Sequence, residues 1–329
     1  MSAPPNQDRF SRVISYLRVS VTDRCNLRCF YCMPDKGVPL LPHEEVLTYE
    51  EILRVVRAGL RLGITKVRIT GGEPLVRRGI EGLVAEVAAL PGITDLSLTT
   101  NGVLLAEKAA ALRKAGLCRV NISLDSRQKE RFARITGCDL QERVREGISA
   151  ALSAGFSRVK LNVVLLAGMN TDEAADFAEM TLATAMDVRF IEYMPVAGRR
   201  NFDEKLFAPA AEARALIEER FGALVPEPAE AMDGPAVMAR IPGAPGRVGF
   251  IGAVSGHFCE TCNRLRLTPD GRLLPCLFSG AEIGLKGPLR AGASEEEIRA
   301  LLHGAILSKP KSHREFPEDR GRGMSRIGG

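Results

Sequence analysis

Residues 15–32 read SYLRVSVTDRCNLRCFYC. In the first half, the apolar residues Leu17 and Val19 alternate with the polar residues Arg18 and Ser20. Because successive side chains of a strand point to opposite faces, this pattern predicts a strand with one apolar and one polar face. Three cysteines with the spacing CxxxCxxC follow directly. The stretch therefore predicts a group of thiols just beyond the carboxyl end of a strand.

The same alternation returns five more times before residue 195. Strands are predicted at 66–70, 95–100, 119–124, 158–165 and 188–193, and helical stretches near 49–62, 79–90, 104–115, 141–154 and 172–184. Connections of this length indicate βα units and a parallel sheet, which makes the fold class α/β. If helices cover the apolar faces, the polar faces line a wet barrel lumen. The alternative is an open sheet with one solvated face.

One more helix is predicted near 210–221. A change in composition after it predicts a boundary between two parts of the chain. Residues 226–246 hold five prolines and three glycines and show little periodicity. We therefore expect a body at 1–222 and a smaller C-terminal region at 223–329. In that region, short alternating segments occur near 247–252, 264–268 and 272–276, and a helical pattern near 294–308.

Overall composition narrows the class of protein. Of the 329 residues, 45% are hydrophobic and 26% are charged, which is typical of a globular chain. No apolar run approaches the roughly 18 residues of a membrane span, and the N-terminus lacks a secretory pattern, so we expect a cytoplasmic protein. The net charge of +5 permits anionic ligands without indicating nucleic acid.

Six of the eight cysteines form two groups of three. The first triple, Cys25, Cys29 and Cys32, suits an iron–sulfur cluster, since a structural zinc ion normally takes four ligands. The second triple is Cys259, Cys262 and Cys276. Its spacing allows either a zinc ribbon completed by His257 or a second cluster.

The first triple, with an aromatic residue before its last cysteine, and the sequence GGEP at 71–74 resemble the radical S-adenosylmethionine (SAM) superfamily. The resemblance implies a partial (β/α)6 barrel of the TIM type, in which the first triple binds a 4Fe-4S cluster and SAM chelates its open iron. Reductive cleavage of SAM would then yield a 5′-deoxyadenosyl radical. The positions that match SAM contacts are Tyr31, Gly72, Ser123 and Met194.

Within that superfamily the chain resembles the MoaA family, the GTP 3′,8-cyclases of molybdenum cofactor biosynthesis. The resemblance rests on RVSVTDRCNLRCFYCMP, VRITGGEPLVR, LTTNG, NISLDS, KLNVV, FIEYMP, CETCNRLRLTPDG and the terminal Gly-Gly, from about residue 12 to residue 329. It implies that the adenosyl radical abstracts the ribose 3′ hydrogen of GTP and that the carbon radical attacks C8. It also implies a second 4Fe-4S cluster, held by the second triple, that binds guanine.

This resemblance assigns further residues. The positions that match GTP contacts are Arg18, Arg68, Thr99, Lys160, Arg264, Leu265 and Arg266. Arg189, on the sixth predicted strand, is expected to join them, and Gly328 and Gly329 are expected to act inside the site. The resemblance also implies a low-potential electron donor of the flavodoxin or ferredoxin type and a cyclic pyranopterin monophosphate synthase that receives the product. A monomer and a homodimer both stay open.

Two expectations about charge follow from the strand faces. Arg18, Arg68 and Lys160 lie on polar faces, so we expect them to bind a triphosphate, with Asp125 as the only opposing acid. Asp125 is expected to partner a basic neighbour, and Glu73 is given no role as a base. Rival interpretations are a radical SAM maturase that modifies peptides, and a non-enzymatic electron carrier or zinc module.

Overall fold

The computed structural model describes residues 4–33, 39–196, 202–230, 233–278, 280–312 and 324–328. In this part of the chain all strands join one sheet, in the order β12-β11-β10-β1-β2-β3-β4-β5-β6-β9-β8-β7. The strands are β1 (Tyr16–Ser20), β2 (Lys66–Thr70), β3 (Asp95–Thr100), β4 (Arg119–Ser123), β5 (Arg158–Leu165), β6 (Asp187–Glu192), β7 (Val225–Pro226), β8 (Val237–Arg240), β9 (Arg247–Ile251), β10 (Arg264–Leu267), β11 (Arg272–Leu274) and β12 (Ile283–Gly284).

Helices α1 to α7 follow the strands of the body, and α8 to α10 come after β12. They are α1 (Tyr49–Arg61), α2 (Ile80–Ala88), α3 (Leu105–Lys114), α4 (Lys129–Thr136), α5 (Gln141–Ser153), α6 (Ala174–Ala183), α7 (Ala210–Phe221), α8 (Lys286–Arg290), α9 (Glu295–Leu307) and α10 (Met324–Ile327). No helix in the described ranges has the length and apolar character needed to cross a membrane.

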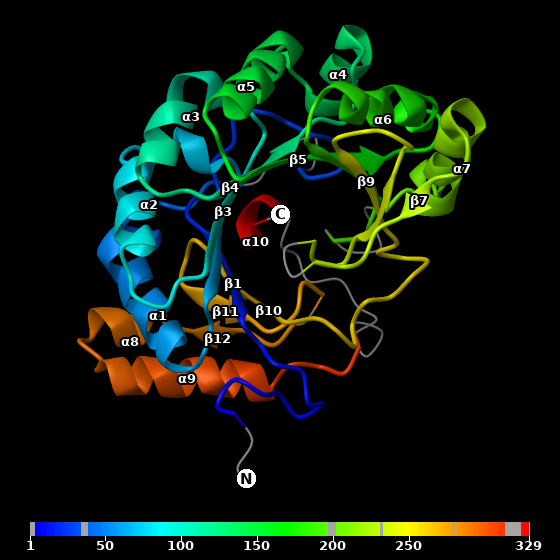
Figure 1. Cartoon of the computed structure of the whole chain (residues 1–329). Helices are drawn as coiled ribbons and strands as arrows, with labels where there is room; N and C mark the ends of the chain where they lie inside the picture. Colours follow the sequence, from blue (N-terminus) through cyan, green and yellow to red (C-terminus); the bar gives the residue numbers. More distant parts are fainter. Residues whose placement is uncertain are drawn as a thin grey trace.

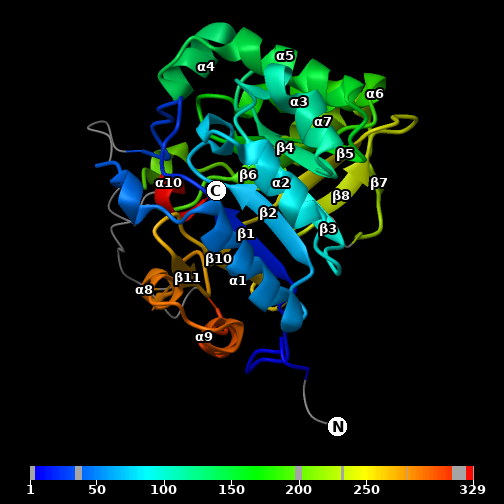
Figure 2. The ribbon, with the colours of Figure 1, turned by 90° about the vertical axis from the view of Figure 1, so that its left-hand side faces the viewer.

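Strands β1 to β6 pair in parallel with their sequence neighbours and curve around a central space. Helices α1 to α6 lie outside this arc, and α10 lies inside it (Figure 1). Viewed from the side, the strands run obliquely behind α1 and α2 (Figure 2). The expected partial (β/α)6 barrel is confirmed.

The two faces of each strand have different surroundings. The apolar residues of β1 and β2, such as Leu17 and Val67, are buried in the main hydrophobic core beneath the helices. The polar residues that alternate with them along β1 to β6 face the lumen. Many of these are buried as well, including Arg68 in β2, Asn121 in β4 and Lys160 in β5. The lumen is therefore a polar interior.

The chain beyond residue 222 extends this same sheet at both edges. β10 pairs in parallel with β1, and β9 pairs in parallel with β6. The antiparallel strands β11, β12, β8 and β7 then continue outward. The division into two parts at residue 222 stays a prediction.

The sequence analysis missed three helices, α4, α8 and α10, of which α4 is the longest. α4 comes directly after the loop that follows β4, in a stretch with four charged residues and few apolar ones. Its apolar residues Phe132 and Ile135 are buried, three positions apart on one helix face. A face this narrow over eight residues gives too little periodicity to stand out in sequence.

Candidate functional site

The first cysteine triple lies in the loop after β1, which packs against the end of β2. The backbone N–H of Gly72 donates to Thr22 O at 2.7 Å, and that of Glu73 donates to Arg24 O at 2.8 Å. A Cβ atom on Gly72 would lie 2.4 Å from Arg24 O, so only glycine permits this approach. The two motifs of the sequence analysis thus form one structure.

Glu73 fastens this loop to the end of β3. Its carboxylate accepts hydrogen bonds from Thr100 Oγ1 at 2.8 Å and from the backbone N–H of Asn101 at 2.6 Å. The Asn101 amide in turn donates to Asn26 Oδ1 at 2.7 Å and lies 3.7 Å from Cys25 Sγ. Burial raises the pKa of Glu73 to about 7, although these hydrogen bonds oppose the shift. Its contacts fit a structural role.

The four predicted SAM contacts gather at the carboxyl end of the parallel strands. Tyr31 lies in the cysteine loop, and Gly72, Ser123 and Met194 follow or end β2, β4 and β6. The rings of Tyr31 and Tyr193, the residue before Met194, have centroids 6.4 Å apart.

Asp125 has a different partner from the one expected. Its carboxylate accepts a hydrogen bond from Tyr31 Oη at 2.5 Å and one from the backbone N–H of Val164 at 2.8 Å. The expected basic partner is therefore wrong. A hydroxyl and an amide satisfy the carboxylate here because Tyr31 reaches it from the cysteine loop. Burial raises the pKa of Asp125 to about 6, against the effect of both hydrogen bonds.

The second triple lies at the opposite end of the lumen. Cys259 and Cys262 precede β10, whose first residue pairs with Tyr16 at the start of β1. Cys276 follows β11, which runs antiparallel to β10 and returns to the same end. The register of the sheet therefore separates the two triples by the length of the strands.

The thiols of both triples fit iron–sulfur clusters by their chemistry. All eight cysteines are free thiols, and each is partly exposed. Burial opposes ionisation of Cys262, but Arg264 and Lys309 outweigh it and lower its pKa to about 6. Across the described residues, no three side chains of His, Cys, Asp or Glu form a group that could hold a single metal ion. In a cluster each thiolate binds a separate iron, so the thiols need not converge on one point.

Arginines crowd the lumen between the two triples. Arg18 is the register partner of Arg68 on one side and of Arg266 on the other. Burial and these two neighbours lower the pKa of Arg18 well below its ordinary value. Burial, followed by the charge of Arg264, lowers the pKa of Arg266 to about 10. Since arginine keeps its proton, these shifts express the cost of crowding buried cations, and a bound anion would relieve it.

Two buried atoms beside these arginines lack a partner. Within the described part of the chain, Arg266 Nε and Thr99 Oγ1 form no hydrogen bond. Buried polar groups are normally satisfied, so the two atoms indicate a polar ligand. Leu265 differs from its neighbours, because its side chain lies in the hydrophobic core and leaves only its backbone near the lumen.

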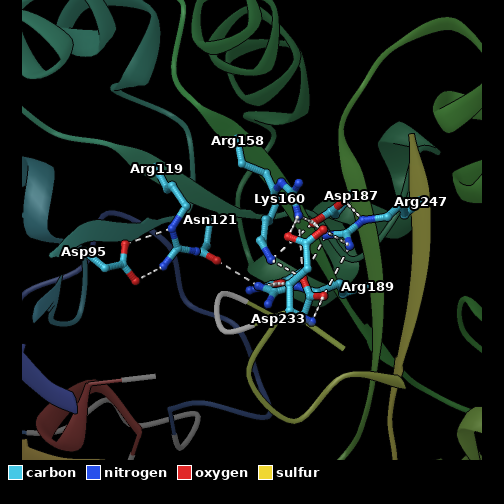
Figure 3. Close-up of polar contacts among 11 residues, drawn as sticks. Asp95, Arg119, Asn121, Arg158, Lys160, Asp187, Arg189, Asp233 and Arg247 are labelled. Carbon is cyan, nitrogen blue, oxygen red and sulfur yellow. Dashed lines mark hydrogen bonds and ion pairs between the residues drawn. The ribbon is translucent and has the colours of Figure 1, made fainter. Parts of the chain in front are cut away.

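Lys160 belongs to a buried ion-pair network at the amino end of the barrel (Figure 3). Its Nζ atom lies 3.1 Å from Asp233 Oδ1 and 3.2 Å from Asp187 Oδ2. Arg247 contacts the same two carboxylates at 2.8 and 2.9 Å. The expectation that Asp125 alone opposes the lumen cations is therefore wrong. Asp187 begins β6, one residue before the predicted strand, and Asp233 enters from the proline-rich segment.

Arg189 lies beside this network and contacts neutral side chains. Its guanidinium donates to Asn121 Oδ1 at 2.8 Å and to Asn162 Oδ1 at 2.6 and 3.0 Å. Burial, and next the charge of Arg68, lower the pKa of Arg189 to about 9. Arg189 therefore joins the arginines of the lumen, as its strand position predicts.

Residues 324–328 lie in the lumen, at the carboxyl ends of β1 and β2 (Figure 1). Gly328 is buried, and its φ of +83° is a conformation that glycine adopts without strain. A Cβ atom there would lie 2.6 Å from Thr70 Cγ2 and 3.1 Å from Ser20 Cβ, at the ends of β2 and β1. Gly329 lies outside the described residues. The segment that bears Gly328 thus packs against the same strands as Arg18 and Arg68.

Comparisons with known proteins divide the chain in two. The family described as Radical SAM superfamily matches residues 19–181, and the family described as Molybdenum Cofactor Synthesis C matches residues 186–315. The GTP 3′,8-cyclase of Pelotomaculum thermopropionicum is 51% identical over 325 residues, which cover 98% of this chain and 100% of that protein. The GTP 3′,8-cyclase of Moorella thermoacetica is 49% identical over 324 residues, again 98% of this chain and 100% of the relative.

Solved structures show the same fold at much lower identity. SuiB of Streptococcus suis, bound to S-adenosylmethionine, superimposes with a TM-score of 0.59 at 16% identity and covers 89% of this chain and 68% of that one. A structure described as native anSMEcpe with bound AdoMet gives a TM-score of 0.58 at 17% identity, over 92% of this chain and 82% of the other. At such identities the likeness is one of fold alone.

Proposed function

Because this chain belongs to the GTP 3′,8-cyclase family of radical SAM enzymes, we propose that it converts GTP to (8S)-3′,8-cyclo-7,8-dihydroguanosine 5′-triphosphate, the first step of molybdenum cofactor biosynthesis. The observation that carries the proposal is the order of groups along the lumen. One cysteine triple stands at each end, and a crowded set of arginines lies between them.

The carboxyl end is the proposed SAM site. Cys25, Cys29 and Cys32 would hold a 4Fe-4S cluster there, and Tyr31, Gly72, Ser123 and Met194 would contact SAM. Once bound, the cluster and SAM supply the one-electron chemistry that generates the 5′-deoxyadenosyl radical. The contribution of the chain is to fix this loop, through Glu73 and the close packing at Gly72.

GTP would span the lumen between the two ends. The second triple, Cys259, Cys262 and Cys276, would hold the second 4Fe-4S cluster, to which guanine binds. Thr99 and Arg266 offer unsatisfied hydrogen-bonding atoms, and Arg18, Arg68, Arg189, Arg264 and Lys160 offer positive charge to the triphosphate. Leu265 could contribute through its backbone. Gly328 and Gly329 would act beside the ribose.

The partners follow from the reaction. A low-potential donor of the flavodoxin or ferredoxin type would supply the electrons, and a cyclic pyranopterin monophosphate synthase would consume the product. Eight free thiols suit a reducing cytoplasm. The assembly would be a monomer or a homodimer.

The test is anaerobic incubation of the reconstituted protein with SAM, dithionite and GTP, followed by mass analysis. We expect 5′-deoxyadenosine and a cyclised product that has the same mass as GTP, because it loses the ribose 3′ hydrogen and gains one hydrogen on reduction, and chromatography before the mass analysis separates it from GTP. The Cys25→Ser variant is the matched negative control. Cleavage of SAM without any new guanine product would contradict the proposed substrate.

A further inference from the structure

A buried lysine, Lys309, lies beside the second triple and is not among the residues proposed to bind a cluster, SAM or GTP. Lys309 follows the end of α9 and is only 3% exposed. Its ammonium donates to the carbonyl oxygen of Pro275 at 2.7 Å and to that of Arg264 at 2.9 Å. Removing a charged group from water costs several kcal/mol, so a lysine buried at this position requires interactions that compensate this cost.

The two carbonyls belong to the loops that carry the cysteines. Pro275 directly precedes Cys276, and Arg264 is two residues beyond Cys262. A single ammonium therefore ties together two loops that come from different sides of the β10–β11 hairpin.

Cys259, the remaining cysteine of the second triple, is linked to the residues that follow Lys309. Arg12 donates to Cys259 O at 2.8 Å and to Pro310 O at 2.6 Å. Ser312 Oγ lies 4.0 Å from Cys259 Sγ. Residues 309–312 thus form an anchor segment that is linked to both loops of the second triple.

The charges around Lys309 are unusual for a buried lysine. Within the described residues it forms no ion pair with a carboxylate, and its charged neighbours are Cys262, Cys276, Arg12 and Arg264. The only negative groups among these are the two cysteines, as thiolates. Among its neighbours in the described part of the chain, the negative charge that would face the ammonium is that of the thiolates of the second triple, which a metal cluster requires.

We propose that Lys309 is a positioning residue for the second cluster: it holds the loops of Cys262 and Cys276 in place, and its positive charge favours the reduced form of the cluster. The inference rests on the proposed second 4Fe-4S site. Reduction adds a negative charge to the cluster, and a cation nearby in a medium of low dielectric constant stabilises that charge. Groups around a cluster that supply hydrogen bonds and charge are known to set its potential.

The experiment compares three variants of the full-length, anaerobically reconstituted protein. Lys309→Met keeps an unbranched side chain, one atom shorter, and removes the charge and the donors, whereas Lys309→Arg keeps both. Lys311→Met is the matched control, since Lys311 is exposed and contributes only its backbone to the anchor segment. The measurements are iron per chain and the midpoint potentials of both clusters, from redox titration followed by electron paramagnetic resonance. The signal that changes on addition of GTP identifies the second cluster.

Wild-type protein is expected to hold about eight irons per chain, four in each cluster. Two results for Lys309→Met support the inference. Either iron falls to about four per chain while cleavage of SAM persists, or iron is retained and the second cluster becomes about tenfold harder to reduce, which is about 59 mV for one electron. In both cases Lys309→Arg and Lys311→Met should resemble wild type.

An Lys309→Met protein with eight irons and an unchanged second midpoint would overturn the inference. A wild-type protein with only four irons would instead contradict the proposed second cluster itself. The two failures are therefore distinguishable.

Discussion

Lys160 has two carboxylate neighbours, and this changes what its removal should do. In the Lys160→Ala variant, Asp187 and Asp233 lose one of their cations and turn the amino end of the lumen more negative. A charged hydrogen bond contributes about 1.5–3 kcal/mol. We therefore expect GTP binding to weaken roughly ten- to hundredfold, at about 1.4 kcal/mol per factor of ten. Calorimetry on the anaerobic protein measures this, with guanosine as the ligand that lacks phosphates.

A double variant that also changes Asp233 tests whether the negative charge left behind weakens GTP binding. Adding Asp233→Asn to Lys160→Ala removes a negative charge that Lys160 neutralises in wild type, and should restore part of the affinity for GTP. Glu230→Gln changes a neighbouring acid that contacts Arg158 and Arg247 but not Lys160, and should leave the affinity near that of wild type. Equal losses for GTP and guanosine in Lys160→Ala would mean that Lys160 supports the fold or the base site.

Glu73 makes stability depend on pH. Its folded pKa of about 7 lies above the ordinary value near 4.3, so the folded protein retains a proton that the unfolded chain has released. Stability therefore falls as pH rises through this window and levels off above it. Between pH 5.5 and pH 7.5, wild type should lose roughly 2 kcal/mol more than Glu73→Gln, which cannot titrate.

Unfolding at the two pH values, followed anaerobically, gives the comparison. Asp125, with a pKa raised to about 6, titrates in both proteins and cancels in the difference. The same dependence on pH in both proteins would show that Glu73 stays ionised in the fold.

At the scale of elements, the short helix α10 is the unusual one, because it occupies the lumen instead of the outer layer (Figure 1). Gly328→Ala should displace it, since the new Cβ would lie 2.6 Å from Thr70 Cγ2 at a φ of +83°. The left-handed conformation alone costs alanine about 1–2 kcal/mol. We expect product formation to fall on the order of tenfold or more, while iron content, SAM cleavage and GTP binding persist.

The control for this change is Gly284→Ala. Gly284 lies in the edge strand β12, has no neighbour within 4 Å of an added Cβ, and needs no positive φ. The measurement is product formed per chain, by chromatography followed by mass analysis. Full activity in Gly328→Ala would mean that the position of α10 in the lumen has no part in the reaction.

At the scale of the whole molecule, the sheet places the two cysteine triples at opposite ends of its parallel strands. We expect about eight irons and no zinc per chain from anaerobic metal analysis. Cys276→Ser should lose about four irons and all cyclisation, yet keep some cleavage of SAM, because the first triple lies a full strand length away. About four irons with one zinc in wild type would instead favour the zinc ribbon with His257.

Much of this architecture could be predicted from the sequence, because it depends on residues that are close together along the chain. The alternation in β1 to β6 follows from the geometry of a strand, so the strand positions and the polar lumen could be read from residues such as Arg18 and Arg68. The spacing CxxxCxxC keeps three thiols close whatever the rest of the chain does. The resemblance of the motifs to a known family then supplied the chemistry.

The partners of the charged groups depended on contacts between residues far apart in sequence. Asp233 reaches Lys160 from a proline-rich segment with no periodicity, and Lys309 meets Cys262 and Cys276 only because α9 packs beside the β10–β11 hairpin. Electrostatic energy depends on distance and burial in three dimensions, and spacing along a chain reports neither. For that reason the kind of site could be predicted from the sequence. The ion pairs of Lys160 and the position of Lys309 beside the second triple could be recognised only in the folded structure.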